Sequence, residues 1–312
     1  MDEAKLNLRD KILSCPICYE PVIWNSQPGL SLESLAHCSL RCRRCRKSYS
    51  GNESHIHLTV TGGNKVYGES MAASTELFRF PLVSFLYERG WRQSFSILRG
   101  FPGPAKEFEL IKSYLKPVLG GNIIDASCGS GMFSRLFAKS GLFSLVVGLD
   151  FSETMLKECY GFSKQEDKFP DENLILVRSA ISRLPFASHT VDAVHVGAAL
   201  HCWPSQSAAV AEISRVSRPG GIFVATTYIL DGLLSYAPLR RPIREACLLD
   251  VIYILMELSK CFYLKFTIFL FRAHFFATAD PHAFLSEKEL EDLCTRNRRF
   301  VMISALKPVV EL

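Results

Sequence analysis

The chain has 312 residues, which is enough for one large domain and a smaller one. Hydrophobic residues make up 48% of it and predict a well-filled core, whereas a net charge of +5 is too mild to indicate a nucleic-acid partner by itself. The 11 cysteines are an odd number and several lie in apolar runs, which indicates reduced thiols in an intracellular compartment.

The first residues carry no recognisable targeting segment. The chain starts with Met-Asp-Glu-Ala-Lys, which is neither an apolar signal segment nor the Arg- and Ser-rich, acid-poor start of a transit peptide. We therefore expect no transit peptide in the chain as given, which leaves open whether an organelle address has been removed.

Two Cys-x2-Cys pairs near the N-terminus predict a structural zinc site. Cys15 and Cys18 form the first pair, and Cys42 and Cys45 form the second. Four thiolates at this spacing complete the tetrahedral shell of a zinc ion and leave no open position for chemistry. A segment of about 60 residues has too small a core to fold stably without a bound metal or a similar cross-link. We expect a zinc ribbon over residues 1–62, with free thiols in a degenerate ribbon as the alternative.

Basic residues crowd around the second cysteine pair and have two interpretations. They are Arg41, Arg43, Arg44, Arg46 and Lys47. Such a patch can bind the phosphates of RNA, or it can simply offset the charge of the thiolates, which is the interpretation we favour. Residues 55–60 alternate between apolar and polar side chains and predict a strand that closes the module. The run Gly62-Gly63-Asn64 then ends it.

Residues 63–104 predict a helical bridge between the ribbon and the main domain. Residues 75–98 are rich in Phe, Leu, Tyr and Trp and predict an amphipathic helix that covers the mouth of the site. An aromatic stripe of this kind also fits a helix that belongs to the core. A Pro-Gly-Pro break at 102–104 then precedes a helix over residues 105–116.

From residue 105 to 312 apolar strands and amphipathic helices alternate, which predicts a parallel sheet with helices on both faces. Strands are expected near residues 122–126, 144–149, 173–178, 191–196, 221–227 and 300–305. Further helices are expected near residues 131–140, 152–161, 205–216 and 286–294. Ser152 is the expected N-cap of the helix that follows it. The run Arg-Pro-Gly-Gly at 218–221 is expected to form the turn into the strand at 221–227.

A glycine-rich turn follows the first strand of this domain. Residues 122–131 read Asn-Ile-Ile-Asp-Ala-Ser-Cys-Gly-Ser-Gly, and the next strand ends in Asp150. Gly129 and Gly131 have no Cβ and let a ligand approach the backbone, while the following helix points its free N–H groups at that ligand. Asp150 lies where a carboxylate accepts hydrogen bonds from two ribose hydroxyls. The segment predicts an adenosine-type cofactor at the carboxyl end of the sheet.

Details of this turn favour S-adenosylmethionine over a nicotinamide. A nicotinamide fingerprint needs Gly or Ala where this chain has Ser134. Asp125 ends the strand, where an acid can organise the loop around the amino group of a methionine moiety. The pattern resembles motif I of class I S-adenosylmethionine-dependent methyltransferases, with Ser127 in place of the first glycine. Nicotinamide or flavin binding and a vestigial loop remain as alternatives.

The chain as a whole resembles the plant plastid methyltransferases that are found with plastoglobules. Those proteins carry a Cys-x2-Cys ribbon ahead of a class I methyltransferase domain. The matching stretches are residues 15–45, 80–91, 125–131, 198–204 and 224–228. The same plan is similar to that of bacterial enzymes that methylate a guanine of large-subunit ribosomal RNA.

This resemblance implies a fold, a cofactor and a compartment. The fold would be α/β, with a Rossmann-like, mainly parallel sheet of the seven-stranded type and a small N-terminal zinc ribbon. The cofactor would be S-adenosylmethionine. Its expected contacts are Asp125, Ser127, Cys128, Gly129, Gly131, Asp150, Phe151, Met155 and Ile181. The compartment would be the chloroplast, with plastoglobules as the site.

Three departures from the family pattern bear on these expectations. Ala180 stands where the family has an Asp that reaches the adenine amino group, a loss that costs about 1 kcal/mol or more. Residues 243–279 form an atypical apolar insertion, but charged residues interrupt it. Because it has no run of about 18 uncharged apolar residues, we expect no spanning helix. A short link before the strand at 300–305 predicts that the sheet lacks one edge strand.

We expect the enzyme to methylate a small lipophilic acceptor such as a prenylquinone, with peripheral association with a membrane or lipid droplet. His201 follows the fourth strand and is the candidate general base for a hydroxyl acceptor, with a packing or loop histidine as the alternative. Tyr228 is expected to line the acceptor pocket, and Cys202 is not expected to act as a nucleophile.

Two other functions stay open at this point. The cysteine ribbon and its basic residues favour an RNA base methyltransferase, whose binding would weaken steeply with salt. Ser127, Ala180 and the unusual C-terminal region favour a non-catalytic protein that binds zinc and the cofactor without turning over an acceptor.

Overall fold

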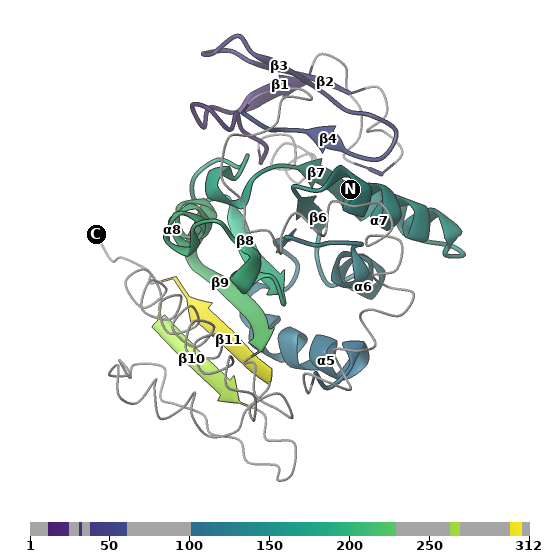
Figure 1. Ribbon diagram of the computed structural model, residues 1–312, viewed down its shortest axis with the longest axis vertical. Helices are drawn as coiled ribbons and strands as arrows, with labels where there is room; N and C mark the ends of the chain where they lie inside the picture. The colour runs from purple at the N-terminus through teal and green to yellow at the C-terminus, as the bar shows by residue number, and fades with distance from the viewer. Residues whose placement is uncertain are drawn as a thin grey trace, which may run out of the picture.

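The structure is a computed structural model that describes residues 12–24, 31–32, 38–60, 101–228, 263–268 and 300–307 (Figure 1). For His201 and Tyr228 it describes the backbone alone. The aromatic helix expected within residues 75–98 and the helix expected near 286–294 lie outside the described residues. Most of the apolar insertion at 243–279 does so as well.

An 8-stranded sheet forms the body of the molecule, with the strand order β10-β11-β9-β8-β5-β6-β7-β4 (Figure 1). Its central strands are β5 (Asn122–Ala126), β6 (Leu145–Asp150), β7 (Leu174–Arg178), β8 (Val191–Gly197) and β9 (Ser217–Tyr228). These strands pair in parallel. The chain runs outward from β5 to β7 and then returns to place β8 on the other side of β5. A ligand crevice is expected at such a reversal, at the carboxyl ends of the strands.

Helices cover both faces of the sheet, as the alternating pattern predicts. They are α5 (Pro104–Leu115), α6 (Met132–Ser140), α7 (Glu153–Gln165) and α8 (Gln206–Val216), with short 3-10 turns η4 (Lys116–Val118), η5 (Asp171–Asn173), η6 (Ile181–Arg183) and η7 (Leu200–Cys202). Neighbouring residues of β5 belong to different cores: Ile123 packs with α5, α6 and α7, whereas Ile124 packs with α8 and the N-terminal module. The strands are mostly apolar because both of their faces are buried, and the few polar side chains in them, such as Asp125 and His195, are buried as well.

Serine side chains start two of these helices. The Ser152 hydroxyl accepts a hydrogen bond from the Met155 N–H at 3.4 Å, which confirms the expected N-cap of α7. Ser205 caps α8 in the same way through the Ala208 N–H at 3.3 Å. Each cap satisfies one of the free N–H groups of a first helical turn.

The far edge of the sheet is complete, so the expected loss of one edge strand is wrong. β11 (Phe300–Leu306) runs antiparallel to β9 and carries β10 (Tyr263–Ile268) antiparallel on its other side. β10 comes from inside the stretch at 243–279. A short apolar run is compatible with a helix or a buried strand, and only pairing with β11 distinguishes them here.

The start of β9 also differs from the expectation. The strand begins at Ser217, so the run 218–221 lies within it rather than forming a turn ahead of it. The pairing with β8 shifts register between Val191 and Ala193, beside this run. A bulge therefore takes the place of the expected turn, and Gly220, with φ of 76°, provides the backbone conformation for it.

The N-terminal module forms a 3-stranded antiparallel sheet of β1 (Val22–Trp24), β2 (Ser39–Cys42) and β3 (Ser48–Ser50). β4 (Ile56–His57), expected to close this module, instead joins the main sheet parallel to β7. The expectation that β4 closes the module is therefore wrong. The outer edge of β7 has unpaired backbone N–H and C=O groups, and a short strand can pair with them whatever its side chains are, so the sequence pattern does not predict this pairing. In the parts of the chain that the structure describes, no helix is long and apolar enough to cross a bilayer.

Candidate functional site

The turn between β5 and α6 holds three residues in the left-handed region. Ser127 has φ of 58°, Gly129 of 57° and Gly131 of 78°. The first of these is the position where the resembling motif has a glycine, and the serine keeps the backbone conformation of that glycine. The Ser127 hydroxyl accepts a hydrogen bond from the indole N–H of Trp203 at 3.1 Å. Trp203, which the sequence analysis did not single out, thereby ties this turn to the segment after β8.

Gly131 is required by helix packing. A Cβ at this position would lie 1.9 Å from the Cys159 sulfur of α7. The absence of a side chain therefore lets the turn before α6 lie close to α7, a reason that ligand access alone did not suggest. Gly148 in β6 lacks a side chain for a similar reason, since a Cβ there would lie 3.0 Å from the Ser134 hydroxyl of α6. Both positions hold α6 close to the sheet, with its N-terminus at the turn.

Asp150 binds the backbone of two segments, the glycine turn and the start of α7. One carboxylate oxygen accepts from the Gly129 N–H at 2.9 Å and the other from the Ser152 N–H at 2.8 Å. Burial raises the pKa of this carboxyl above its ordinary value, although the two N–H donors favour the ionised form. Each oxygen retains a further lone pair, which is the capacity needed to accept from two vicinal hydroxyls.

Asp125 lies behind the turn, at 1% exposure. Its two oxygens contact the Ser134 hydroxyl at 2.6 Å and the His195 Nδ1 at 2.8 Å. The carboxylate thus joins α6 to β8, and its geometry is that of a residue that positions the turn. His195 is fully buried against the rings of Phe133 and Phe137. A histidine inside an apolar strand was the available sequence signal for it, and the sequence analysis missed it.

The remaining expected cofactor contacts gather at the same carboxyl edge. Cys128 belongs to the turn, and its backbone N–H donates to the carbonyl of Leu149 at 2.9 Å. Phe151 follows Asp150 directly and Met155 is buried in the first turns of α7. Ile181 starts η6 just after β7, with Ala180 beside it. The structure therefore brings together the segments that the sequence placed at the ends of three different strands.

The segment after β8 completes this edge. His201 lies in η7, at the carboxyl end of the strand as expected, and its side chain and that of Tyr228 lie outside the described residues. Burial raises the pKa of the Cys202 thiol to about 11, and the charge of Asp150 contributes. The thiol is therefore protonated at neutral pH, which agrees with the expectation that Cys202 is not a nucleophile.

Glu107 is a further polar residue that the sequence analysis missed. It lies in the first turn of α5 at 2% exposure, and its carboxylate accepts from the Thr226 hydroxyl at 2.9 Å. The same hydroxyl accepts a hydrogen bond from the Ala198 N–H at 3.2 Å. This contact fixes the start of α5 against the ends of β8 and β9, beside the crevice.

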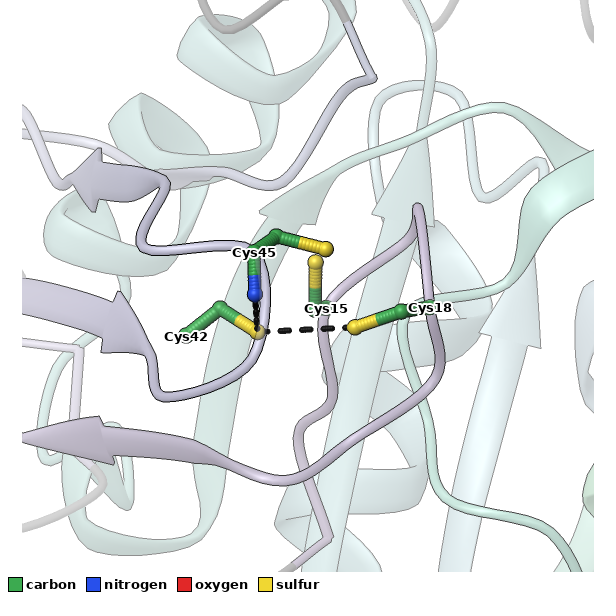
Figure 2. Close-up of side chains that lie close together, drawn as sticks. All are labelled: Cys15, Cys18, Cys42 and Cys45. Atoms are coloured by element: carbon green, nitrogen blue, oxygen red, sulfur yellow. Dashed lines mark hydrogen bonds between the residues drawn. The ribbon is translucent and has the colours of Figure 1, made fainter.

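The four cysteines expected to bind a metal converge on one point (Figure 2). Their sulfur atoms all lie within 4.8 Å of one another, and those of Cys18 and Cys42 are 3.5 Å apart. The Cys45 N–H points at the Cys42 sulfur at 3.3 Å. The residue after each pair, Tyr19 and Arg46, has a positive φ, so both turns have the same shape. Four soft donors in two matching turns fit a tetrahedral zinc ion.

A second group of metal-ligand types is better explained as a hydrogen-bonded joint. Ligand atoms of His55, His57 and Glu153 lie within 4.8 Å of one another. The Asn52 amide nitrogen lies 3.4 and 3.0 Å from the Nε2 atoms of the two histidines. The Arg178 guanidinium donates to the Glu153 carboxylate at 2.7 Å. The positive charge of Arg178, already paired with the Glu153 carboxylate, would repel a metal ion bound at the same place.

Comparison with known proteins agrees with this arrangement. A methyltransferase domain family matches residues 124–225. A chloroplastic methyltransferase of Arabidopsis thaliana is 55% identical over 310 residues, which cover 96% of this chain and 79% of the relative. A demethylmenaquinone methyltransferase of Staphylococcus haemolyticus is 34% identical over 107 residues, which cover 34% of this chain and 43% of that protein.

The fold has a counterpart among solved structures. Phosphoethanolamine N-methyltransferase 2 of Haemonchus contortus, solved with phosphomonomethylethanolamine and S-adenosylhomocysteine, superposes with a TM-score of 0.51. The match has 16% identity and covers 74% of this chain and 60% of that one, so it speaks for the fold alone. The identity to the Arabidopsis relative shows that the chain belongs to a methyltransferase family. We therefore no longer consider the nicotinamide, flavin and non-catalytic alternatives. With the glycine turn, Asp150 and the helix N-terminus meeting at the carboxyl edge of the sheet, the chain belongs to the plant class I S-adenosylmethionine-dependent methyltransferases.

Proposed function

We propose that this enzyme methylates a small lipophilic acceptor of the prenylquinone type in the chloroplast, at plastoglobules. The observation that carries the proposal is the meeting of the Ser127–Gly131 turn, Asp150 and Ile181 at the carboxyl ends of β5, β6 and β7. The quinone class of acceptor is supported by the demethylmenaquinone methyltransferase relative and by the mild net charge of +5. The chloroplast is supported by the Arabidopsis relative, whose name places it there.

The protein's contribution to the reaction is mainly to position the two substrates. S-adenosylmethionine supplies a methyl group already activated by the positive sulfur. The turn at Gly129 and the N-terminus of α6 would hold the methionine portion, with Asp125 and His195 keeping the turn in place. Asp150 would accept from the ribose hydroxyls, and Ile181 would pack against adenine. Holding donor and acceptor in line converts a two-molecule reaction into one of fixed geometry, the effect expected to dominate here.

A hydroxyl acceptor needs a base to remove its proton. We assign this role to His201, because η7 places its backbone at the carboxyl end of β8, next to the segment that holds Trp203. Tyr228, at the end of β9, is the proposed neighbour of the acceptor. A neutral imidazole can take the proton at neutral pH.

Zinc is the metal that we assign to Cys15, Cys18, Cys42 and Cys45. With four thiolates the coordination shell is full, so the ion would stabilise the module and take no part in methyl transfer. The module contributes few buried side chains, which pack with one face of the main sheet, and metal binding would supply a large share of its folding free energy.

The function is tested by following radiolabelled methyl transfer from S-adenosylmethionine to a demethylated prenylquinol presented in lipid droplets. We expect label in the lipid phase, and we expect it to depend on His201, with His201→Ala losing transfer while S-adenosylhomocysteine binding remains. Binding of the cofactor without transfer to any quinol would overturn the choice of acceptor. Methyl transfer that continues in the His201→Ala variant would rule out His201 as the base.

A second candidate acceptor is an RNA base, because the second cysteine turn is exposed and basic. Arg41, Arg43, Arg44 and Arg46 are all exposed, and Arg44 faces Glu20 at 3.6 Å. Phosphate binding by such residues releases counterions, so RNA affinity would fall steeply as salt rises. Transfer of label to ribosomal RNA, weakened by salt and by Arg43→Ala, would select this candidate over the quinol.

A further inference from the structure

We propose that the metal-bound N-terminal module clamps residues 178–187 and thereby sets the affinity of the enzyme for S-adenosylmethionine. These residues run from the end of β7 through η6 and include Ala180 and Ile181. The proposal rests on the proposed function, since it takes this loop as the adenine side of the cofactor site. It concerns how tightly the loop is held.

One end of the loop is held by β4. His57 pairs with Arg178 in parallel, and the Leu58 N–H donates to the Arg178 carbonyl at 3.0 Å. Ile56 pairs with Val177, and both of these side chains are fully buried. The module therefore extends the main sheet at the residue where the loop begins.

The other end is held by the residues that lead into the first cysteine pair. The Ser14 N–H donates to the Pro185 carbonyl at 2.8 Å, and the Ala187 N–H donates to the Ile12 carbonyl at 3.1 Å. Leu13 bridges to Phe186, and both side chains are fully buried. Cys15 comes directly after this pairing, so the first metal ligand and the loop are joined by one short stretch of backbone.

The metal-binding turn itself contacts the middle of the loop. The Arg183 guanidinium donates to the carbonyls of Pro16 and Ile17, at 3.3 and 3.4 Å. These two carbonyls lie between Cys15 and Cys18, within the ring that a bound metal would close. Arg183 is the last residue of η6, which Ile181 begins. A change in the shape of the turn would therefore move the donor–acceptor pairs that anchor η6.

Tyr19 adds a side-chain contact from the same turn. Its ring lies 3.9 Å from the guanidinium carbon of Arg215, measured to the ring centroid. Arg215 in turn donates to the carbonyls of Leu184 and Phe186, each at 2.8 Å. The positive φ of Tyr19, 61°, belongs to the shape of the metal-binding turn. Tyr19 therefore connects the metal site to the loop without being a metal ligand.

A second connection reaches the ribose side of the crevice. Arg178, which pairs with β4, donates to the Phe151 carbonyl at 3.1 Å and to the Glu153 carboxylate at 2.7 Å. Phe151 follows Asp150, and Glu153 begins α7. The module thus supports both the adenine loop and the segment that carries the ribose carboxylate.

The physical consequence is a difference in preorganisation. Ala180 cannot provide the hydrogen bond that the family's Asp gives to adenine, so affinity on this side depends on a loop already held in its binding conformation. Without metal, the Cys15–Cys18 turn loses its constraint and cofactor binding must order the loop. Because coupling between two sites is reciprocal, the cofactor must also strengthen metal retention by the same factor.

The test uses the full chain loaded with zinc, and it measures S-adenosylhomocysteine affinity by calorimetry before and after a chelator removes the metal. We expect roughly a tenfold or greater loss of affinity without zinc, the scale of an ordinary coupling between sites. We also expect saturating S-adenosylhomocysteine to slow zinc release to a chromogenic chelator. Circular dichroism shows whether the metal-free main domain is still folded.

Tyr19→Ala keeps all four cysteines and so tests the connection with the metal in place. It is expected to retain zinc and to lower S-adenosylhomocysteine affinity severalfold. Its matched control is Glu20→Ala, which changes the next side chain, one that is exposed and makes only a surface ion pair. This control is expected to match the wild type.

The outcomes separate the two proposals. Equal affinities with and without zinc in folded protein, or a Tyr19→Ala variant that binds as tightly as Glu20→Ala, would overturn the clamp and leave the proposed function standing. A zinc-loaded wild-type chain that fails to bind S-adenosylhomocysteine at all would overturn the proposed function and this proposal with it.

Discussion

Asp150 is the residue on which cofactor affinity is expected to depend most. Asp150→Ala removes the carboxylate that organises the Gly129 and Ser152 N–H groups and that would accept from the ribose. Hydrogen bonds to a charged group contribute about 1.5–3 kcal/mol each, so the loss of two should weaken S-adenosylhomocysteine binding on the order of 100-fold or more. Calorimetry measures this, with Asp167→Ala at an exposed position as the control. Unchanged affinity in Asp150→Ala would remove Asp150 from the site.

His195 is expected to act on stability rather than on the cofactor directly. In His195→Leu, the buried Asp125 carboxylate loses the partner that lies 2.8 Å away. A buried acceptor left without its donor costs about 1–3 kcal/mol, and more when it is charged. Urea unfolding should show this loss, and the double variant Asp125→Asn, His195→Leu should be less destabilised than the sum of the single variants. Strict additivity would mean that the two residues do not interact energetically.

At the scale of elements, the contact between the turn before α6 and α7 depends on one missing side chain. Gly131→Ala would place a Cβ 1.9 Å from the Cys159 sulfur and should destabilise the domain by about 2–4 kcal/mol. Gly141→Ala is the matched control. Its φ of 63° is also left-handed, but no atom lies within 4 Å of the added Cβ, so only the backbone strain of about 1–2 kcal/mol applies. Thermal or urea unfolding of both variants tests the clash, and equal losses would argue against it.

At the scale of the whole molecule, His55 makes the junction between module and sheet sensitive to acid. Burial lowers the pKa of His55 to about 3, whereas an unfolded histidine titrates near 6.5. The unfolded state therefore binds more protons between these values, so this stability is fully present above pH 6.5 and is lost as the pH falls. From pH 7 to pH 5 the loss from this group is about 2 kcal/mol.

The measurement is the free energy of unfolding at both pH values in the wild type and in His55→Gln. The variant should be less stable at pH 7, because it loses the packing of a buried ring, but it should lose less stability on going to pH 5. Release of zinc by acid affects both proteins and so drops out of the comparison. Equal acid sensitivity in the two proteins would show that His55 does not titrate as described.

The sequence alone determined the central part of this protein, because its signals there are local. The β5 strand, the glycine turn and Asp150 are close in sequence, and the serine caps act within one turn of their own helices. The spacing of the two Cys-x2-Cys pairs also predicted that their four sulfur atoms meet at one site. Parallel strands also bring their carboxyl ends to one edge whatever the side chains between them, so Ile181 and η7 lie at that edge as expected.

The tertiary structure decided what depends on distant pairing. β4 joins β7 rather than closing the module because β7, far along the chain, has an unpaired edge. The segment of β10 is a strand because it pairs with β11. The partners of Asp125 and the reason for Gly131 lie in β8 and α7, which no spacing in the sequence relates to them. Such long-range contacts depend on which strand edges and packing positions the rest of the fold leaves open. Local sequence patterns therefore do not predict them, and the tertiary structure is needed to find them.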